Sequence, residues 1–212
     1  MFYIQRFLRT GLSASVLCLG AVAAQAGDGN QIYILQQGPL GLDGSNTLNV
    51  DQSAASGSTV AGDFDPAGRT TPALQSGIDN SGQIIISGEG GQVAFLQQGI
   101  SNTANVTLSS ALGLAFLQQD GIGNAATLTV DPLGVGGTIQ QIGNRNLADL
   151  TVGAGAQGSL IQKGDNNQFG FTVSGSGASA SYTAIGNNMA PAGTGPMVIS
   201  NGASVTITQT QF

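Results

Sequence analysis

The chain has no histidine, no tryptophan and a single cysteine. That residue, Cys18, lies in an N-terminal segment that we expect to be removed, so no disulfide framework is expected in the rest of the chain. Glu89 is the only glutamate, and one close pair of acids, Asp63 and Asp65, lies in a Gly- and Pro-rich stretch where acids usually serve solubility. Few side chains are therefore suited to acid and base catalysis or to metal binding. We expect neither an enzyme nor a cofactor.

Charge is also scarce, because Asp, Glu, Lys and Arg make up only 8% of the residues. Eleven acidic residues outnumber five basic ones. Nucleic acid is not an expected partner, since binding it depends on clustered Lys and Arg. Most of the polarity comes from neutral residues, and neutral polar surfaces stack on copies of themselves with little repulsion.

No apolar run reaches the roughly 20 residues that a membrane-spanning helix needs. The longest run, Leu12 to Val22, follows Arg6 and Arg9 and precedes the small residues Ala24 and Ala26. This order is typical of a secretory signal peptide. We predict that residues 1–26 are a signal peptide cleaved after Ala26, and that the mature protein is secreted.

What the chain does contain is a repeated phrase, Gln-x-Gly-x-x-Asn, in which successive glutamines are 22, 22, 22 and 21 residues apart. Its members are Gln75, Gln97, Gln119, Gln141 and Gln162, with Gly77, Gly99, Gly121, Gly143 and Gly164, and with Asn80, Asn102, Asn124, Asn146 and Asn167. A fixed period of this length is the signature of a stacked repeat protein.

Each repeat predicts a strand, a turn and a strand. After Asn124, for example, the apolar residues Ala126, Leu128 and Val130 alternate with Thr127 and Thr129, a pattern typical of a strand with one buried face. An apolar residue also stands two places before each motif glutamine. Gly-x-x-Asn between the strands suits a tight turn.

Such short strands bury an apolar face only by stacking, which predicts an all-β fold, a parallel β-solenoid of two sheets with a repeat of about 22 residues. Equivalent side chains then lie above one another, so the glutamines and asparagines of the repeat are expected to form hydrogen-bonded ladders. We take these residues, together with Gln36 of a first, stretched repeat, as the candidate assembly site.

The repeats also divide the chain. The stretched repeat covers residues 27–50 and reaches Asn46, residues 51–71 are predicted to be a loop insertion, and residues 72–175 hold the regular repeats. Gln75 follows Gln36 by 39 positions, about 17 more than one period. Residues 176–212 form a degenerate repeat, with Ala184 and Met189 at the Gln and Asn positions, that could be a cap.

The segment Gln119-x-Gly121-x-Gly123-Asn124-x-Ala126 resembles the core of the curlin repeat of bacterial curli fibres. The segments that begin at Gln97 and Gln141 match it with one substitution each, and the resemblance extends over residues 36–173. The curlin repeat usually also has a Ser six residues before the Gln and a second Gln four residues after the Ala. In this chain the Ser positions hold Gly91, Gly113 and Val135, and the second Gln positions hold Leu108, Val130 and Val152. These departures indicate a divergent relative.

The resemblance implies a homo-polymeric subunit of an adhesive extracellular amyloid fibre at the bacterial cell surface. It also implies partners: other curlin-type subunits, an outer-membrane secretion pore and periplasmic accessory factors. Whether the chain nucleates or elongates a fibre stays open at this point. Asp120, Asp149 and Asp165 near the later turns either slow premature assembly or are merely solvated turn residues.

A monomeric, capped solenoid adhesin is the alternative. In that interpretation, one threonine from the strand after each of the last four motif asparagines contributes to a flat recognition face. These residues are Thr107, Thr129, Thr151 and Thr172. Threonine at such positions is also explained by β-propensity alone.

Overall fold

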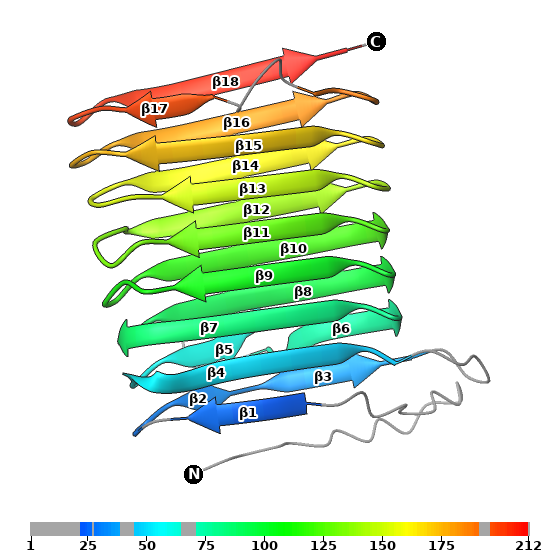
Figure 1. Ribbon diagram of the computed structural model, residues 1–212, viewed down its shortest axis with the longest axis vertical. Helices are drawn as coiled ribbons and strands as arrows, with labels where there is room; N and C mark the ends of the chain where they lie inside the picture. The colour runs from blue at the N-terminus through cyan, green and yellow to red at the C-terminus, as the bar shows by residue number, and fades with distance from the viewer. Residues whose placement is uncertain (1–21, 27, 39–44, 65–70, 191–195, 212) are drawn as a thin grey trace.

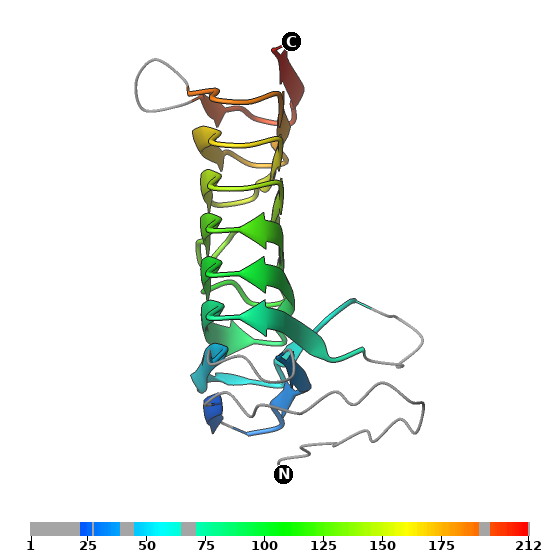
Figure 2. The ribbon, with the colours of Figure 1, turned by 90° about the vertical axis from the view of Figure 1, so that its right-hand side faces the viewer.

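The computed structural model describes residues 22–26, 28–38, 45–64, 71–190 and 196–211. These residues form an elongated stack of two parallel sheets that face each other across a narrow core (Figures 1 and 2). The predicted all-β, two-sheet parallel solenoid is therefore confirmed. The described residues contain no helix of the length and apolarity needed to cross a membrane.

The eight-stranded sheet contains, in spatial order, β1 (Val22–Ala26), β4 (Thr47–Ser56), β7 (Ser81–Glu89), β9 (Thr103–Leu108), β11 (Ala125–Val130), β13 (Leu147–Val152), β15 (Gln168–Ser174) and β17 (Met197–Ile199). The facing ten-stranded sheet contains β2 (Gln31–Ile32), β3 (Ile34–Gln37), β5 (Thr59–Ala61), β6 (Ala73–Ile78), β8 (Gln92–Ile100), β10 (Leu114–Ile122), β12 (Gly136–Ile142), β14 (Gln157–Lys163), β16 (Ser179–Ile185) and β18 (Ser204–Thr210).

Neighbouring strands pair in the register that the repeat predicts. Gln119 of β10 lies between Gln97 and Gln141, and Leu128 of β11 lies between Val106 and Leu150. Each repeat thus supplies one strand to each sheet and forms one level of the stack. Because side chains alternate along a strand, in-register stacking collects the apolar residues of every level into one continuous core.

Leu128 lies fully buried in the middle of this core. Its replacement by alanine is expected to lower the free energy of unfolding by about 2 to 5 kcal/mol, because the levels on both sides are held by their own backbone pairing and cannot collapse into the cavity. Urea titration of monomeric protein, followed by circular dichroism, measures this loss. Thr127→Ala, on the exposed side of the same strand, is the control, with an expected change within about 0.5 kcal/mol. Equal losses in the two variants would contradict the assignment of the buried face.

The predicted loop over residues 51–71 is narrower in the structure. Residues 51–56 lie in β4 and residues 59–61 form β5, and β5 and β6 share one level, since both pair with β8. Ala61 is opposite Ala94, and Leu74 is opposite Leu96, so most of the surplus length falls between Ala61 and Leu74. The rest of the surplus lies between Gln37 and Asn46 and at an irregularity between Asp51 and Ala54.

Both ends of the stack add strands to the regular repeats. Residues Val22–Ala26, which include the predicted cleavage residues Ala24 and Ala26, form β1 and pair with β4. Cleavage after Ala26 stays a prediction. At the other end, β16 and β18 continue the ten-stranded sheet in register, while β17 adds only three residues to the other sheet.

Candidate functional site: stacked amide ladders

The six candidate glutamines form one continuous ladder along the inner face of the ten-stranded sheet. In each step the Nε2 of one glutamine donates to the Oε1 of the next, at 2.6 to 2.8 Å, in the order Gln36, Gln75, Gln97, Gln119, Gln141 and Gln162. All are buried, and the five from Gln75 onward are 0% exposed. The ladder therefore runs through the dry core and not along the surface.

Each glutamine also joins the two sheets. The second hydrogen of Nε2 is donated to a backbone carbonyl of the facing sheet, as from Gln97 to Ser81 at 3.1 Å and from Gln119 to Thr103 at 2.9 Å. Burial of an amide without partners is costly, and this arrangement gives both hydrogens an acceptor. The ladder positions consequently require both the shape and the hydrogen-bonding capacity of an amide.

The asparagines form a second ladder where the chain crosses between the sheets. The Oδ1 of Asn80 accepts from the backbone N of Asn102 at 3.1 Å and from its Nδ2 at 3.0 Å. The Nδ2 of Asn102 in turn donates to the carbonyl of Gly121 in the next level at 2.9 Å. Corresponding bonds from backbone N to Oδ1 connect Asn46, Asn80, Asn102, Asn124, Asn146 and Asn167.

The candidate glycines place their carbonyls for these bonds. Gly77, Gly99, Gly121, Gly143 and Gly164 have φ between 113° and 131°, a conformation that side chains rarely adopt. A Cβ on Gly99 would collide with the carbonyl oxygen of Gly121 in the next level. Glycine is therefore required at this position both by the backbone conformation and by the closeness of adjacent levels.

The structure contains a third polar ladder, in the later turns, that the repeated phrase does not predict. In the later turns the Oδ1 of Asp165 accepts from the backbone N of Asn144 at 2.7 Å, and Asn187 accepts from the backbone N of Asp165 at 2.7 Å. The earlier levels have Ile100 and Ile122 on this column. Because the column changes from isoleucine to Asn or Asp partway along the chain, it has no repeat signature. Asp165 is thus a hydrogen-bonded turn residue.

A polar cluster near the N-terminal end was also missed. Asn30 donates from Nδ2 to the carbonyls of Gln52 and Ala55, and its Oδ1 accepts from the backbone N and the hydroxyl of Ser58. Asn30, Gln52 and Ser58 are all buried. These residues stand outside the Gln-x-Gly-x-x-Asn phrase, so the repeat contains no signal for them.

The ladders change at the level of β16. Ala184 takes the glutamine position, and Met189 takes the asparagine position, where its backbone N still donates to Oδ1 of Asn167 at 3.1 Å. Tyr182 fills the core beside them, with its ring centroid 4.9 Å from that of Phe169. In β18 an amide returns at Gln209, whose Oε1 accepts from the Tyr182 hydroxyl. Burial raises the pKa of Tyr182 above its ordinary value, so this hydroxyl keeps its proton at neutral pH.

Other candidate positions lie away from the ladders. The threonine column stacks in register on the outer face of the eight-stranded sheet and is half-buried. Asp63 accepts from the backbone N of Thr71 at 3.2 Å, while Asp65 lies outside the described residues. No group of three or more possible metal-binding side chains occurs within the described ranges.

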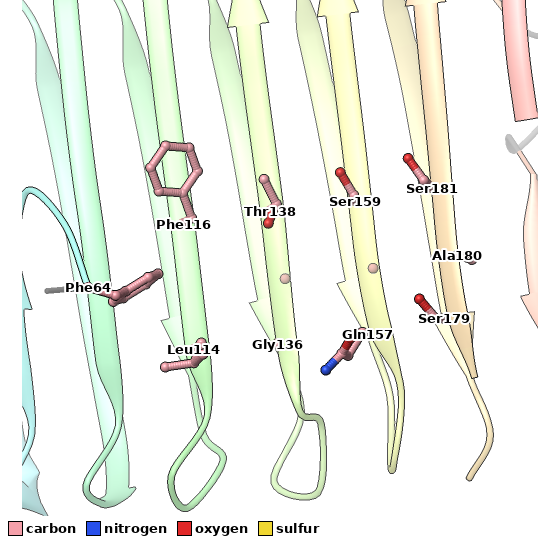
Figure 3. Close-up of a pocket in the computed structure, with 12 residues that line it drawn as sticks. Phe64, Leu114, Phe116, Gly136, Thr138, Gln157, Ser159, Ser179, Ala180 and Ser181 are labelled. Carbon is pink, nitrogen blue, oxygen red and sulfur yellow. The ribbon is translucent and has the colours of Figure 1, made fainter. Parts of the chain in front are cut away.

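A shallow pocket lies on the outer face of the ten-stranded sheet (Figure 3). Phe64, Leu114 and Phe116 line one end, and Thr138, Ser159 and Ser181 continue it across β12, β14 and β16. The side chains that line this pocket carry no ionisable group.

Comparisons of the chain with models of protein families, with curated proteins and with solved structures found no match. The candidate site consists of Gln and Asn ladders stacked within a parallel β-solenoid whose repeats are about 22 residues long. This architecture is compatible with amyloid-like subunits.

Proposed function

We propose that the protein is a secreted structural subunit that assembles, by templated stacking of β-strands, into curli-like extracellular amyloid fibres for surface adhesion and biofilm matrix. The observation that carries this proposal is the continuity of the glutamine ladder through six levels of the core. Each level is a template for the next, because it offers a full row of backbone partners, an apolar strip and an amide at fixed positions.

The ends of the stack support the same proposal. Among the described residues, β18 pairs with β16 on one edge only, and β2 pairs with β5 on one edge only. Unpaired strand edges are templates for another chain unless charges, prolines or bulges obstruct them. The strand β18, Ser-Val-Thr-Ile-Thr-Gln-Thr, contains neither a charge nor a proline.

The resemblance to the curlin repeat supplies the remaining parts of the proposal. The fibre consists of copies of this chain alone or also includes other curlin-type subunits. The chain leaves the bacterial cell through an outer-membrane pore with the help of periplasmic accessory factors. The secreted location depends on the predicted signal peptide over residues 1–26.

Seeded polymerisation tests the proposal. Secreted protein diluted from denaturant is expected to show a lag in thioflavin fluorescence that sonicated fibres abolish, because elongation on an existing end bypasses nucleation. Fibre diffraction is expected to show reflections near about 4.7 and 10 Å. A soluble β-rich monomer that forms no fibres with or without seeds would contradict the proposal. That result would favour the monomeric adhesin, whose flat face would be the threonine column.

A further inference from the structure

The apolar core is unfinished at both ends of the stack. The core residues that remain only partly buried are Ile32 and Ile34 in the first described level of the ten-stranded sheet, and Val198, Val205 and Ile207 in the last levels. Each end therefore exposes apolar side chains that a further level would cover.

These end residues occupy the same columns. Following the strand register, the column that begins at Ile34 ends at Ile207, and the column that begins at Gln36 ends at Gln209. Ile32 likewise shares its column with Val205. The exposed strip at one end thus has the same spacing and order as the exposed strip at the other end.

The amide ladder has a direction, which decides how two copies can meet. Gln75, Gln97, Gln119 and Gln141 each accept at Oε1 from the preceding level and donate from Nε2 to the following one. Gln209 keeps this orientation, because its Oε1 accepts from Tyr182 of the preceding strand. Among the described residues nothing donates to Oε1 of Gln36, which faces the other end. Stacking the last level on the first places a donor against an acceptor, whereas two last levels would place donor against donor.

We propose that the partner for each end is the opposite end of a second copy, with β18 of one molecule paired in parallel with β2 and β3 of the next. Val205 then lies on Ile32, Ile207 on Ile34 and Gln209 on Gln36. This inference depends on the proposed self-assembly and specifies its junction. The contact is heterologous and leaves one junction surface open at each end, so it produces an unlimited filament and not a closed dimer.

Both sheets contain eight levels, because β2 and β3 share one level of the ten-stranded sheet and β5 and β6 share another. β1 begins the eight-stranded sheet, and β18 ends the ten-stranded sheet (Figure 1). In the stacked pair, β1 of the second copy lies between its own β4 and β17 of the first copy. Cleavage after Ala26 leaves that place vacant, while the ten-stranded junction stays complete.

Cysteine cross-linking tests the register. Leu35 and Thr208 lie on the outer side of their strands and are opposite each other in the proposed junction. Parallel neighbours lie about 4.8 Å apart, within the Cα separation of roughly 4.4 to 6.8 Å that a disulfide spans. Secreted protein carrying Leu35→Cys and Thr208→Cys, with Cys18→Ala, is polymerised, oxidised and dissolved in denaturant without reductant. We expect a series of covalent trimers, tetramers and longer chains.

Two controls separate this junction from others. Leu35→Cys with Thr206→Cys places the sulfurs two residues out of register, with Cα atoms about 8 Å apart, and at least tenfold less multimer is expected. Thr208→Cys alone is expected to give no covalent dimer. Abundant dimers from that single variant would overturn the head-to-tail arrangement. Fibres without covalent multimers from the Leu35 and Thr208 pair would overturn the junction and leave the proposed function standing. Failure of the parent protein to form fibres would overturn both.

Discussion

Replacement of Gln97 and Gln119 by glutamate is expected to slow fibre elongation at least tenfold and to abolish seeding by parent fibres. A glutamate at position 97 cannot donate to the side-chain oxygen at position 119 or to the carbonyl of Ser81, as Gln97 does. Both positions are 0% exposed, and an unpaired charge at such a site costs several kcal/mol. Because every subunit carries the change, the penalty recurs at every addition. Thioflavin kinetics with seeds of parent protein measure the effect.

The matched control adds the same two charges to exposed positions whose partners in the adjacent strands are uncharged, Gln92→Glu in β8 and Asn105→Glu in β9. Its elongation rate is expected to stay within about threefold of the parent rate, since exposed charges are solvated and screened. Equal inhibition by the two double variants would show that net charge, and not the ladder, controls assembly, and would sink the role assigned to Gln97 and Gln119.

A change of pH distinguishes a lost hydrogen bond from a distorted core. Burial raises the pKa of an unpaired carboxyl, so a glutamate at position 97 takes up a proton as the pH falls to about 4. The protonated group has one donor again and carries no charge. Elongation of the Gln97→Glu and Gln119→Glu double variant is therefore expected to recover in part at low pH. A variant that stays equally slow at both pH values would indicate that packing, and not hydrogen bonding, was lost.

Gly121→Ala is expected to lower the free energy of unfolding by more than about 3 kcal/mol and to prevent seeded growth. Gly121 has φ of 131°, and a Cβ there would collide with the carbonyl oxygen of Gly143. That carbonyl accepts from Nδ2 of Asn124 at 2.8 Å, so any shift that relieves the collision also disturbs the asparagine ladder. Urea titration and seeded thioflavin kinetics on the same protein measure the two effects.

Gly123→Asn is the control, two residues away in the same turn. Gly123 has φ of 67°, and the nearest heavy atom to a Cβ there would be Cγ of Arg145, at 3.8 Å. Ser101 and Arg145 occupy this position in the adjacent turns with φ of 55°. Asparagine tolerates this left-handed conformation, so the stability is expected to change by less than about 1 kcal/mol. A loss as large as that of Gly121→Ala would contradict the assignment of strain and crowding to the first glycine of the turn.

The positions of the regular repeats could be predicted from the sequence because two periods act together. The spacing of about 22 residues places Gln97, Gln119 and Gln141 above one another, and the alternation along each strand determines which side chains face the core. A register error of one residue would expose every apolar side chain of a strand, so the stacking is strongly specified. The glutamines and asparagines of the two main ladders, and the glycines of the regular turns, were identified in this way.

Where the Gln-x-Gly-x-x-Asn phrase is incomplete, the sequence predicted the strands less accurately. Residues 51–61 have no Gln-x-Gly-x-x-Asn and were assigned to a loop, yet residues 51–56 lie in β4 and residues 59–61 form β5. Their position is decided by the edges of β7 and β8, which offer backbone partners to a chain of almost any composition. The polar column of Asn144, Asp165 and Asn187 escaped notice for a related reason, because its hydrogen bonds depend on the turns lying one above another.

By itself the sequence determined the repeat, the all-β class, the two faces of each regular strand and the residues of the two main ladders. Only the tertiary structure decided the split of one level into β5 and β6, the direction of the glutamine ladder and the pairing of residues 22–26 with β4. The physical reason is that a sequence period shows only which residues of successive repeats occupy equivalent positions. The direction of an amide bond, the path of an irregular segment and the form of an end depend on which neighbour supplies the hydrogen-bonding partner.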